Sequence, residues 1–278
     1  MSSIVSPQPP KITIITPSFN QGHFIDETIQ SVLRQNYPNL EHLVFDGGST
    51  DNTIEVLKTH PHIRWVSEKD RGQTHAVNKG TAKATGDIIG WINSDDTFLA
   101  GAFDAVIAKF QSDPDCHVVY GDYHAIDETG NILYSTEGFC GTYEEMIRWW
   151  DYTYNIHQPT LFVRRDVFRM AGLLDESFNY SMDYEWWLRV AKQYRFHRVP
   201  HFIATYRFHR DSKSFAPLER YVYPEMLQAS KRHWGPVWSG RYWRFRKSYQ
   251  LWLLRKKQET LHNPALSEWY HETEKKAE

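Results

Sequence analysis

Apolar runs of strand length alternate with helical patterns over the first 120 residues of the chain. Strand-like runs are expected at 12–16, 42–45, 63–66, 87–92 and 117–120. Amphipathic helical patterns lie between them, at 24–35, 53–58, 73–84 and 100–111. Strands and helices that alternate with such short connections favour right-handed βαβ units. The pattern therefore predicts an α/β fold with a Rossmann-like, mostly parallel sheet that is flanked by helices.

The middle of the chain is more mixed, and its end has a different composition. We expect a hairpin turn at 127–130, a strand at 159–163 and a helix at 183–193. Beyond residue 215, basic and aromatic side chains become frequent. We divide the chain into a flexible N-terminus, a main domain and a basic, aromatic helical C-terminal extension, at 1–10, 11–215 and 216–278.

The composition is that of an ordinary folded protein. The 278 residues include 32 basic and 34 acidic side chains, so the net charge of −2 gives no bias towards nucleic acid. Aromatic residues make up 15% of the chain, more than a disordered sequence carries. The two cysteines, Cys116 and Cys140, exclude a disulfide scaffold and favour a reducing compartment. No apolar run approaches the ~18 residues that span a bilayer, and the first ten residues do not resemble a signal peptide, so we expect a cytoplasmic protein.

Three polar clusters follow predicted strands, where ligands bind in open parallel α/β sheets. They lie at 16–21, 46–51 and 93–96. Each alone is compatible with a helix cap or a turn, but three at one edge favour a shared ligand site. The adjacent carboxylates of Asp95 and Asp96 repel each other, and a divalent ion bound to substrate phosphates would compensate them. Neither a Gly-x-Gly-x-x-Gly motif nor a P-loop occurs, which argues against a dinucleotide oxidoreductase and a P-loop enzyme.

Six motifs follow one another in a characteristic order. They are Ile15-Thr16-Pro17-Ser18-Phe19-Asn20, Asp46-Gly47-Gly48-Ser49-Thr50-Asp51, Asp70-Arg71-Gly72 with Ala76-Val77-Asn78-Lys79-Gly80, Asn93-Ser94-Asp95-Asp96, His157-Gln158-Pro159, and Met182-Asp183-Tyr184-Glu185-Trp186-Trp187-Leu188-Arg189. Together they resemble the signature of glycosyltransferase family 2, over about residues 10–210. The resemblance implies a GT-A fold, a nucleotide-diphospho-sugar donor and transfer with inversion at the anomeric carbon. The main domain would then be catalytic, with a nucleotide-binding half at 11–122 and an acceptor half at 123–215.

The resemblance also implies roles for residues that bind the donor nucleotide. Pro17, Ser18 and Asn20 would line the nucleoside pocket. Asp46 would accept a hydrogen bond from the base, most naturally from N3–H of uracil, so a UDP-sugar is expected. Arg71 would help to hold the nucleotide.

A divalent cation, Mn2+ or Mg2+, is the expected cofactor. By the same resemblance Asp95 would contact the ribose or the diphosphate, and Asp96 would bind the metal. In related enzymes a later histidine often supplies a further ligand, and His209 is our candidate. The alternative for His209 is an ordinary surface or packing role.

Asp183 matches the position of the general base in this family. A sugar hydroxyl is a poor nucleophile, so a carboxylate that takes its proton is required. A helix-capping role for Asp183 is the alternative, and the two are compatible. The family often has an acidic residue before the base, whereas this chain has Met182. We expect His157, Gln158 and Trp187 to contact the donor sugar or the acceptor, with a turn or core packing as the alternatives.

Aromatic residues recur at helical spacing in the C-terminal extension. One face of the predicted helix carries Trp238, Tyr242, Phe245, Tyr249 and Trp252. Basic residues lie between them, and no acidic residue occurs from 236 to 258. Three interpretations stay open: an interfacial helix on an anionic membrane, a helix that docks on the catalytic domain, or an oligomer contact. The first would place the protein peripherally on the inner face of the cytoplasmic membrane, beside a lipid-linked acceptor.

The leading hypothesis is a metal-dependent inverting glycosyltransferase that acts on a glycan or lipid-linked acceptor. Its setting, by family analogy, would be the assembly of cell-surface polysaccharide or lipopolysaccharide. The alternatives are a nucleotidyltransferase that makes sugar nucleotides and a non-catalytic relative that binds them. A nucleotidyltransferase would favour a basic glycine-rich loop after the first strand, and residues 18–22 are not basic. No nucleic-acid partner is expected.

Overall fold

The structure is a computed structural model that describes residues 9–262 apart from 153–154, 211 and 214–215. Its first four strands are β1 (Ile12–Ser18), β2 (Leu40–Asp46), β3 (Arg64–Ser67) and β4 (Ile88–Trp91). They are parallel and lie in the order β3-β2-β1-β4. The connecting helices are α1 (Ile25–Leu33), α2 (Thr53–Lys58) and α3 (Gln73–Lys83). Each of these strands and helices lies within two residues of its expected ends, which confirms the α/β prediction.

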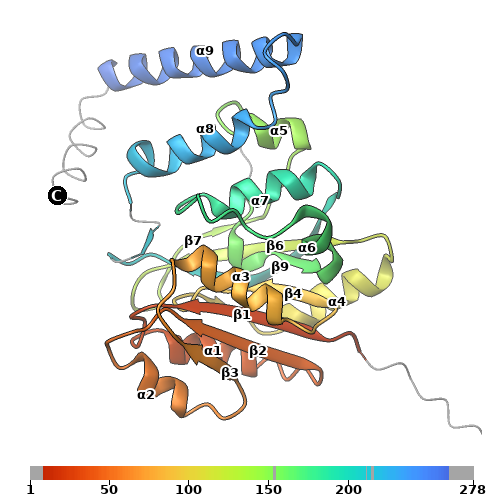
Figure 1. Cartoon of the computed structure of the whole chain (residues 1–278), viewed down its shortest axis with the longest axis vertical. Coiled ribbons are helices and arrows are strands. Elements are labelled where there is room, and N and C mark those ends of the chain that lie inside the picture. The colour runs from red at the N-terminus through yellow and green to blue at the C-terminus, as the bar shows by residue number, and fades with distance from the viewer. Residues whose placement is uncertain (1–8, 153–154, 211, 214–215, 263–278) are drawn as a thin grey trace, which may run out of the picture.

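Alternating side chains along β2 explain why helices cover both faces of this half (Figure 1). Successive residues of a strand point to opposite faces of the sheet. Val44 packs in a cluster with Ile29 of α1, whereas its neighbours Leu43 and Phe45 belong to the cluster that contains Val77 of α3. The continuous apolar run of β2 is therefore buried on both sides, as in other parallel sheets.

The second half of the sheet adds antiparallel pairs. Its strands are β5 (Thr97–Phe98), β6 (Val118–Ile126), β7 (Ile132–Thr136), β8 (Phe162–Arg164) and β9 (Phe196–Arg207). β8 is antiparallel to both β4 and β6, β9 is parallel to β6, and β5 ends the order β3-β2-β1-β4-β8-β6-β9-β5. β7 pairs with β6 through the hairpin that was predicted at 127–130. Helix α4 (Ala102–Ser112) lies between β5 and β6 in the chain.

Four strands differ from the sequence prediction. β5 was not predicted, and β8 begins at Phe162 instead of 159, because Gln158–Thr160 form a 3-10 helix. β6 has nine residues instead of the four expected at 117–120, because its second part pairs with β7 and β9. β9 has twelve residues and was not predicted. Its sequence contains histidines, arginines and Pro200, and its burial changes along its length, so it shows neither a continuous apolar run nor a regular alternation.

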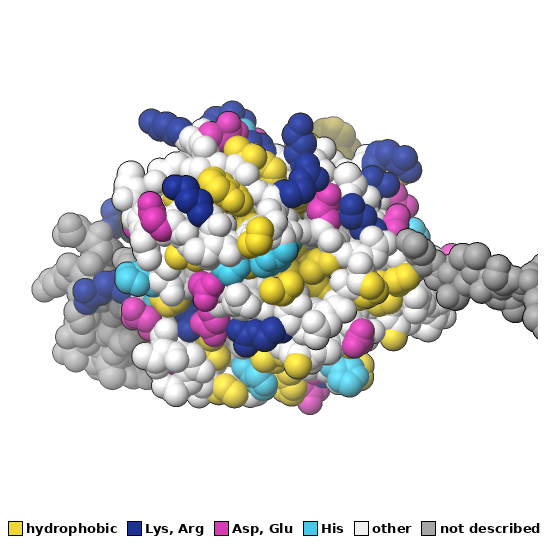
Figure 2. Space-filling model, turned by 90° about the horizontal axis from the view of Figure 1, so that it is seen from below, with side chains coloured by type: hydrophobic (Ala, Val, Ile, Leu, Met, Phe, Trp, Pro, Cys, Tyr) yellow, Lys and Arg dark blue, Asp and Glu magenta, His cyan; other side chains and the backbone are white. Residues whose placement is uncertain are grey.

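Helices form the remaining layers of the molecule. They are α5 (Tyr143–Ile147), α6 (Arg165–Ala171), α7 (Met182–Ala191), the π-helix Leu218–Val222, α8 (Tyr223–Lys231) and α9 (Gly240–His262). Figure 1 shows α7, α8 and α9 stacked on one side of the sheet, with α9 farthest from it. On the opposite side, which Figure 2 shows from below, basic, acidic and apolar side chains are intermixed.

The aromatic face of α9 docks on the rest of the chain. Phe245 is fully buried, and Tyr249 and Trp252 pack against the same core cluster. The ring of Tyr249 lies 5.2 Å from that of Trp150. Of the predicted face, only Trp238, which precedes the helix, is exposed to solvent. No helix within the described part of the chain is long and apolar enough to cross a membrane.

Candidate active site

Two adjoining cavities open at the carboxyl ends of β1, β2 and β4. The first has a volume of about 500 Å3, and its lining includes Pro17, Ser18, Lys69, Asp70, Asp95 and Asn179. The second has a volume of about 690 Å3, and its lining includes His157, Gln158, Asp183, Trp187 and Phe208. Four residues line both cavities: Gln73, Asn93, Tyr206 and Lys213. Two ligands bound side by side would therefore meet at these four side chains.

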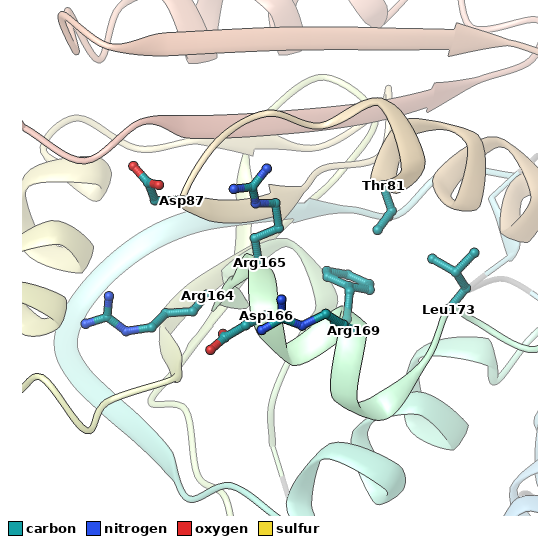
Figure 3. Close-up of a pocket in the computed structure, with 8 residues that line it drawn as sticks. Thr81, Asp87, Arg164, Arg165, Asp166, Arg169 and Leu173 are labelled. Atoms are coloured by element: carbon teal, nitrogen blue, oxygen red, sulfur yellow. The ribbon is translucent and has the colours of Figure 1, made fainter.

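A further hollow lies away from this edge of the sheet. Figure 3 shows three arginines and two aspartates around it, and its lining includes Asp87 at the start of β4 and residues of α6. Arg164 donates hydrogen bonds to the backbone carbonyls of Cys116 and Phe110. None of its lining residues belongs to either of the two adjoining cavities.

The loop after β1 supplies part of the first cavity. Pro17 and Ser18 line it, as predicted, and the buried Ser18 Oγ has no hydrogen-bond partner among the described residues. Asn20 does not line it. Its backbone has a φ of 53°, its N–H donates to Ser49 Oγ at 2.7 Å, and its Oδ1 accepts from the N–H of Thr50 at 2.8 Å. Asn20 therefore joins the two loops that border the cavity instead of lining it, and its contact with the nucleoside stays a prediction.

Asp46 also holds a loop and does not face the first cavity. Its carboxylate is fully buried and accepts hydrogen bonds from the backbone of Gly48 and Ser49 and from the hydroxyls of Ser49 and Ser67. With these donors the carboxylate is satisfied inside the protein. The predicted contact with a base does not fit this burial. The carboxylate that lines the cavity is that of Asp70.

Arg71 points away from the cavities. Its guanidinium donates two hydrogen bonds to Glu176 Oε2, at 2.9 and 2.7 Å, on the surface. The basic side chains that line the first cavity are those of Lys69 and Lys213. The expected nucleotide contact of Arg71 stays a prediction, and the two lysines are the basic side chains placed at the cavity.

The pairing of β5 with β9 brings Asp95 and His209 together. Thr97 of β5 lies opposite Thr205 of β9, and their hydroxyls are 2.7 Å apart. The turn before β5 and the residues after β9 thus meet at one point. Asp95 Oδ2 and His209 Nε2 are 3.0 Å apart. Asp95 lines the first cavity, and His209 is buried behind it.

Asp96 is turned into the protein instead of into a cavity. It is 1% exposed, and its Oδ1 accepts a hydrogen bond from the backbone N–H of Arg207 at 2.9 Å. Burial, and then the charge of Asp95, raises the pKa of Asp96 well above its ordinary value. The Arg207 side chain donates to the backbone carbonyl of Asp95 at 2.8 Å and so fixes the turn. Of the two adjacent carboxylates, that of Asp95 lines the first cavity and that of Asp96 does not, so Asp95 is the better placed of the two to bind a metal.

The pair of Asp95 and His209 fits a divalent cation. Asp95 Oδ2 and His209 Nε2, which are hydrogen-bonded at 3.0 Å, are close enough together to bind one ion in place of the proton between them. No group of three or more metal-binding side chains is found among the described residues. An ion held by two protein ligands leaves positions for water and for phosphate oxygens, as Mg2+ sites commonly do.

Asp183 lies in the first turn of α7 and lines the second cavity. Its Oδ1 accepts a hydrogen bond from the N–H of Tyr184 at 2.7 Å. Burial raises the pKa of Asp183 to about 6, against the opposing effects of this hydrogen bond and of the Lys213 charge. A carboxylate with such a pKa is ionised at neutral pH and accepts a proton more readily than an ordinary aspartate.

The remaining predicted residues line the second cavity. The ring of His157 lies between those of Tyr123 and Tyr206, at 4.1 and 4.4 Å, and burial lowers its pKa to about 4. Gln158 Nε2 donates to the carbonyl of Trp91, while its buried Oε1 finds no partner in the described part of the chain. Trp187 is 2% exposed and forms part of the cavity floor. His157 is therefore a neutral group in an aromatic setting.

Sequence analysis missed Tyr206 and Lys213, which line both cavities. The ammonium group of Lys213 donates to the backbone carbonyl and to Oδ1 of Asn179, at 2.7 and 2.8 Å. Burial of this group lowers the pKa of Lys213 to about 8, although the residue as a whole is exposed. Both residues lie at or just after the end of β9, so recognising that strand would have pointed to them.

The sequence matches the model of one known protein family. The model of glycosyl transferase family 2 matches residues 13–171, which is more than half of the chain. The chain belongs to glycosyl transferase family 2. The family resemblance inferred from the six motifs is thereby confirmed.

Two bacterial relatives are longer than the region that matches this chain. An uncharacterized glycosyltransferase of Rickettsia typhi is 29% identical over 198 residues, which cover 68% of this chain and 62% of that protein. The chondroitin synthase of Escherichia coli is 27% identical over 195 residues, which cover 66% of this chain and 27% of that protein. The chain therefore spans less than two thirds of the length of these relatives.

Solved structures share the fold. TarS of S. aureus in complex with UDP-GlcNAc has a TM-score of 0.63 at 17% identity, over 80% of this chain and 65% of that chain. A mannosyltransferase from Pyrobaculum calidifontis in complex with GDP-Man and Mn2+ has a TM-score of 0.55 at 18% identity, over 97% and 86%. These similarities confirm the predicted GT-A fold.

Proposed function

We propose that this protein transfers a sugar from a nucleotide-diphospho-sugar to a hydroxyl of a glycan or lipid-linked acceptor, with inversion at the anomeric carbon. One observation carries the proposal. Asp183, the candidate base, lines one cavity, and the hydrogen-bonded pair of Asp95 and His209, the candidate metal ligands, lies at the other. The two cavities meet at Gln73, Asn93, Tyr206 and Lys213. A donor in the first cavity would thus present its sugar to an acceptor in the second.

Asp183 would act as the general base. Its carboxylate would take the proton of the attacking hydroxyl as the new glycosidic bond forms and the bond to the diphosphate breaks. A base in one cavity and a leaving group in the other favour a single displacement, in which attack and departure occur on opposite sides of the anomeric carbon. Inversion follows from that geometry.

Asp95, His209 and Lys213 would hold the diphosphate end of the donor. The residues present fit Mn2+ or Mg2+, which would supply charge neutralisation for the departing diphosphate. The Lys213 ammonium group lines both cavities and can donate to a phosphate oxygen where the two ligands meet. The orphaned Ser18 Oγ would hydrogen-bond to the nucleoside.

A UDP-sugar is the donor we favour. The structural neighbours named above carry UDP-GlcNAc in one case and GDP-Man with Mn2+ in the other, so the fold accommodates both bases. The names of the relatives, among them a chondroitin synthase, favour a role in polysaccharide synthesis. In the second cavity, aromatic rings such as those of Trp187 and Phe208 offer flat apolar faces to sugar rings.

The test is a nucleotide-release assay with a panel of UDP- and GDP-sugars, in Mn2+, in Mg2+ and in chelator. We expect metal-dependent release of the nucleoside diphosphate from one donor, stimulated by a glycan or lipid-linked acceptor. The variant Asp183→Asn should lose this activity. A matched control is Asp166→Asn, because Asp166 lines the hollow in Figure 3 and neither cavity. Release of pyrophosphate would favour a nucleotidyltransferase, and the absence of turnover with every donor would favour a non-catalytic relative.

A further inference from the structure

Helix α9 has one docked face and one face that no described residue covers. On the docked face, Phe245 is fully buried. On the other face, Trp243 is 53% exposed, Leu251 44% and Leu254 59%. Trp238, just before the helix, is 84% exposed. Large apolar side chains that are exposed together on one face mark an interaction surface.

The same outer face is strongly basic. Arg244, Arg246, Lys247 and Arg255 are exposed, and none of them forms an ion pair with a described residue. By contrast, Arg241 is bound to Glu144 at 3.0 Å and Lys256 to Glu219 at 3.0 Å, on the docked side. No acidic residue occurs between 236 and 258. The unpaired positive charge of α9 therefore faces outwards.

We propose that this outer face, formed by Trp238, Trp243, Leu251, Leu254, the three exposed arginines and Lys247, binds the surface of an anionic lipid bilayer. Tryptophan and leucine interleaved with lysine and arginine are typical of helices that lie in the membrane interface. The cations would bind lipid phosphates while the apolar side chains enter the upper acyl region. A nucleic-acid surface would leave the leucines without an apolar partner, and an apolar protein groove would leave the four cations unpaired.

This face differs from the one that the sequence indicated. The regular aromatic stripe that includes Tyr249 and Trp252 attaches α9 to the catalytic domain, so it is not available to lipid. The membrane face is the less regular one that starts at Trp238 and Trp243. The docked face of α9 thus packs on the catalytic domain, and its outer face contacts the bilayer, so the helix links the two.

The docked side of α9 also connects the membrane face to the second cavity. The ring of Trp252 lies 5.9 Å from that of Tyr223, and Lys256 pairs with Glu219 of the π-helix. Leu218 and Val222 of the same π-helix line the second cavity. Only this one layer separates the bilayer-binding helix from the cavity, which suits an acceptor anchored in the membrane. This last step rests on the proposed function, whereas the membrane contact does not.

The experiment is co-sedimentation of the full chain with vesicles, without any donor, so that its outcome is independent of catalysis. Neutral phosphatidylcholine vesicles are compared with vesicles that contain about 30 mol% phosphatidylglycerol, at about 50 and 500 mM salt. The charge variant R244Q/R246Q/K247Q/R255Q is matched by R165Q/R169Q/K58Q/K83Q, four exposed cations far from α9. A third variant, W243S/L254S, removes apolar contacts only. Thermal unfolding shows that each variant is folded.

We expect binding to the anionic vesicles at low salt that weakens at least about tenfold at high salt. Each removed cation should weaken it about fivefold, so the charge variant loses roughly several hundred-fold, while its matched control changes less than about twofold. W243S/L254S should also bind more weakly. Equal binding to neutral and anionic vesicles, no binding at low salt, or an equal loss in the matched control would overturn the proposal. So would a dimer in light scattering that the charge variant abolishes, because the face would then belong to a second copy.

Discussion

The pH dependence of transfer is the sharpest test of the site, because the pKa of Asp183 sets it. Burial places that pKa at about 6, two units above the ordinary value of 3.8. The base form then makes up about nine tenths of the protein at pH 7 and about one tenth at pH 5. The value of kcat/KM, which reports the pKa of the free enzyme, should therefore fall about tenfold between these values and approach a slope of one below pH 5. Asp183→Asn should lose a further ~10²–10⁴-fold at pH 7 and show no such profile.

The cause of the shift can be tested in the same assay. The Lys213 charge lowers the pKa of Asp183, so Lys213→Gln should move the midpoint of the profile to higher pH. Initial rates of nucleotide release between about pH 5 and 8 measure this, and calorimetry with the donor shows that Asp183→Asn still binds it. A wild-type rate that is constant from pH 5 to 7, with chemistry rate-limiting, would refute the assignment of Asp183 as the base.

Three further predictions concern stability and the metal. Folding raises the pKa of Asp183, so ionising its carboxyl group destabilises the folded state by up to about 3 kcal/mol above pH 6 and not at all below pH 4. Asp183→Asn should therefore raise the melting temperature at pH 7.5 but not at pH 4. His209→Ala should abolish the Mn2+ dependence of donor binding in calorimetry, whereas Asp96→Asn should retain it, since Asp96 faces the protein interior. The reverse result would show that Asp96, as predicted from the sequence, binds the metal. Phe245→Ala should lower the free energy of unfolding by about 3–5 kcal/mol in urea titrations. Trp243→Ala, on the exposed face of α9, should lower it by less than about 0.5 kcal/mol. Equal losses would show that α9 is not docked as described.

The nucleotide-binding half was predictable because its local patterns agree with its tertiary structure. β1, β2 and β4 are buried on both sides, so their apolar runs are continuous, and the helices between them carry clear amphipathic patterns. β9 was not predictable in this way. Its partners, β5 and β6, are distant in sequence, and its exposure is set by them instead of by its own alternation.

The same division applies to the site. The motifs identified Asp95 and Asp183, because Asp95 lies shortly after the apolar strand β4 and Asp183 lies in the first turn of the predicted helix α7. They did not show which of two adjacent carboxylates faces the cavity, since that depends on the hydrogen bond from Arg207 to Asp96, across 111 residues of chain. Nor did the motifs show that the carboxylate of Asp46 accepts hydrogen bonds from Gly48, Ser49 and Ser67 inside the protein. The direction of a side chain depends on such long-range contacts, and these contacts cannot be derived from a single sequence.

The two-residue strand β5 makes the separation of Asp95 and His209 sensitive to the length of β9. Thr97 and Phe98 fix the alignment with Thr205 and Ala204, and His209 follows four residues after Thr205. A single residue inserted between Thr205 and His209 would turn every later side chain to the opposite side wherever the chain stays extended. Loss of activity in an insertion library should thus cluster at 206–208, beside the pair of Asp95 and His209.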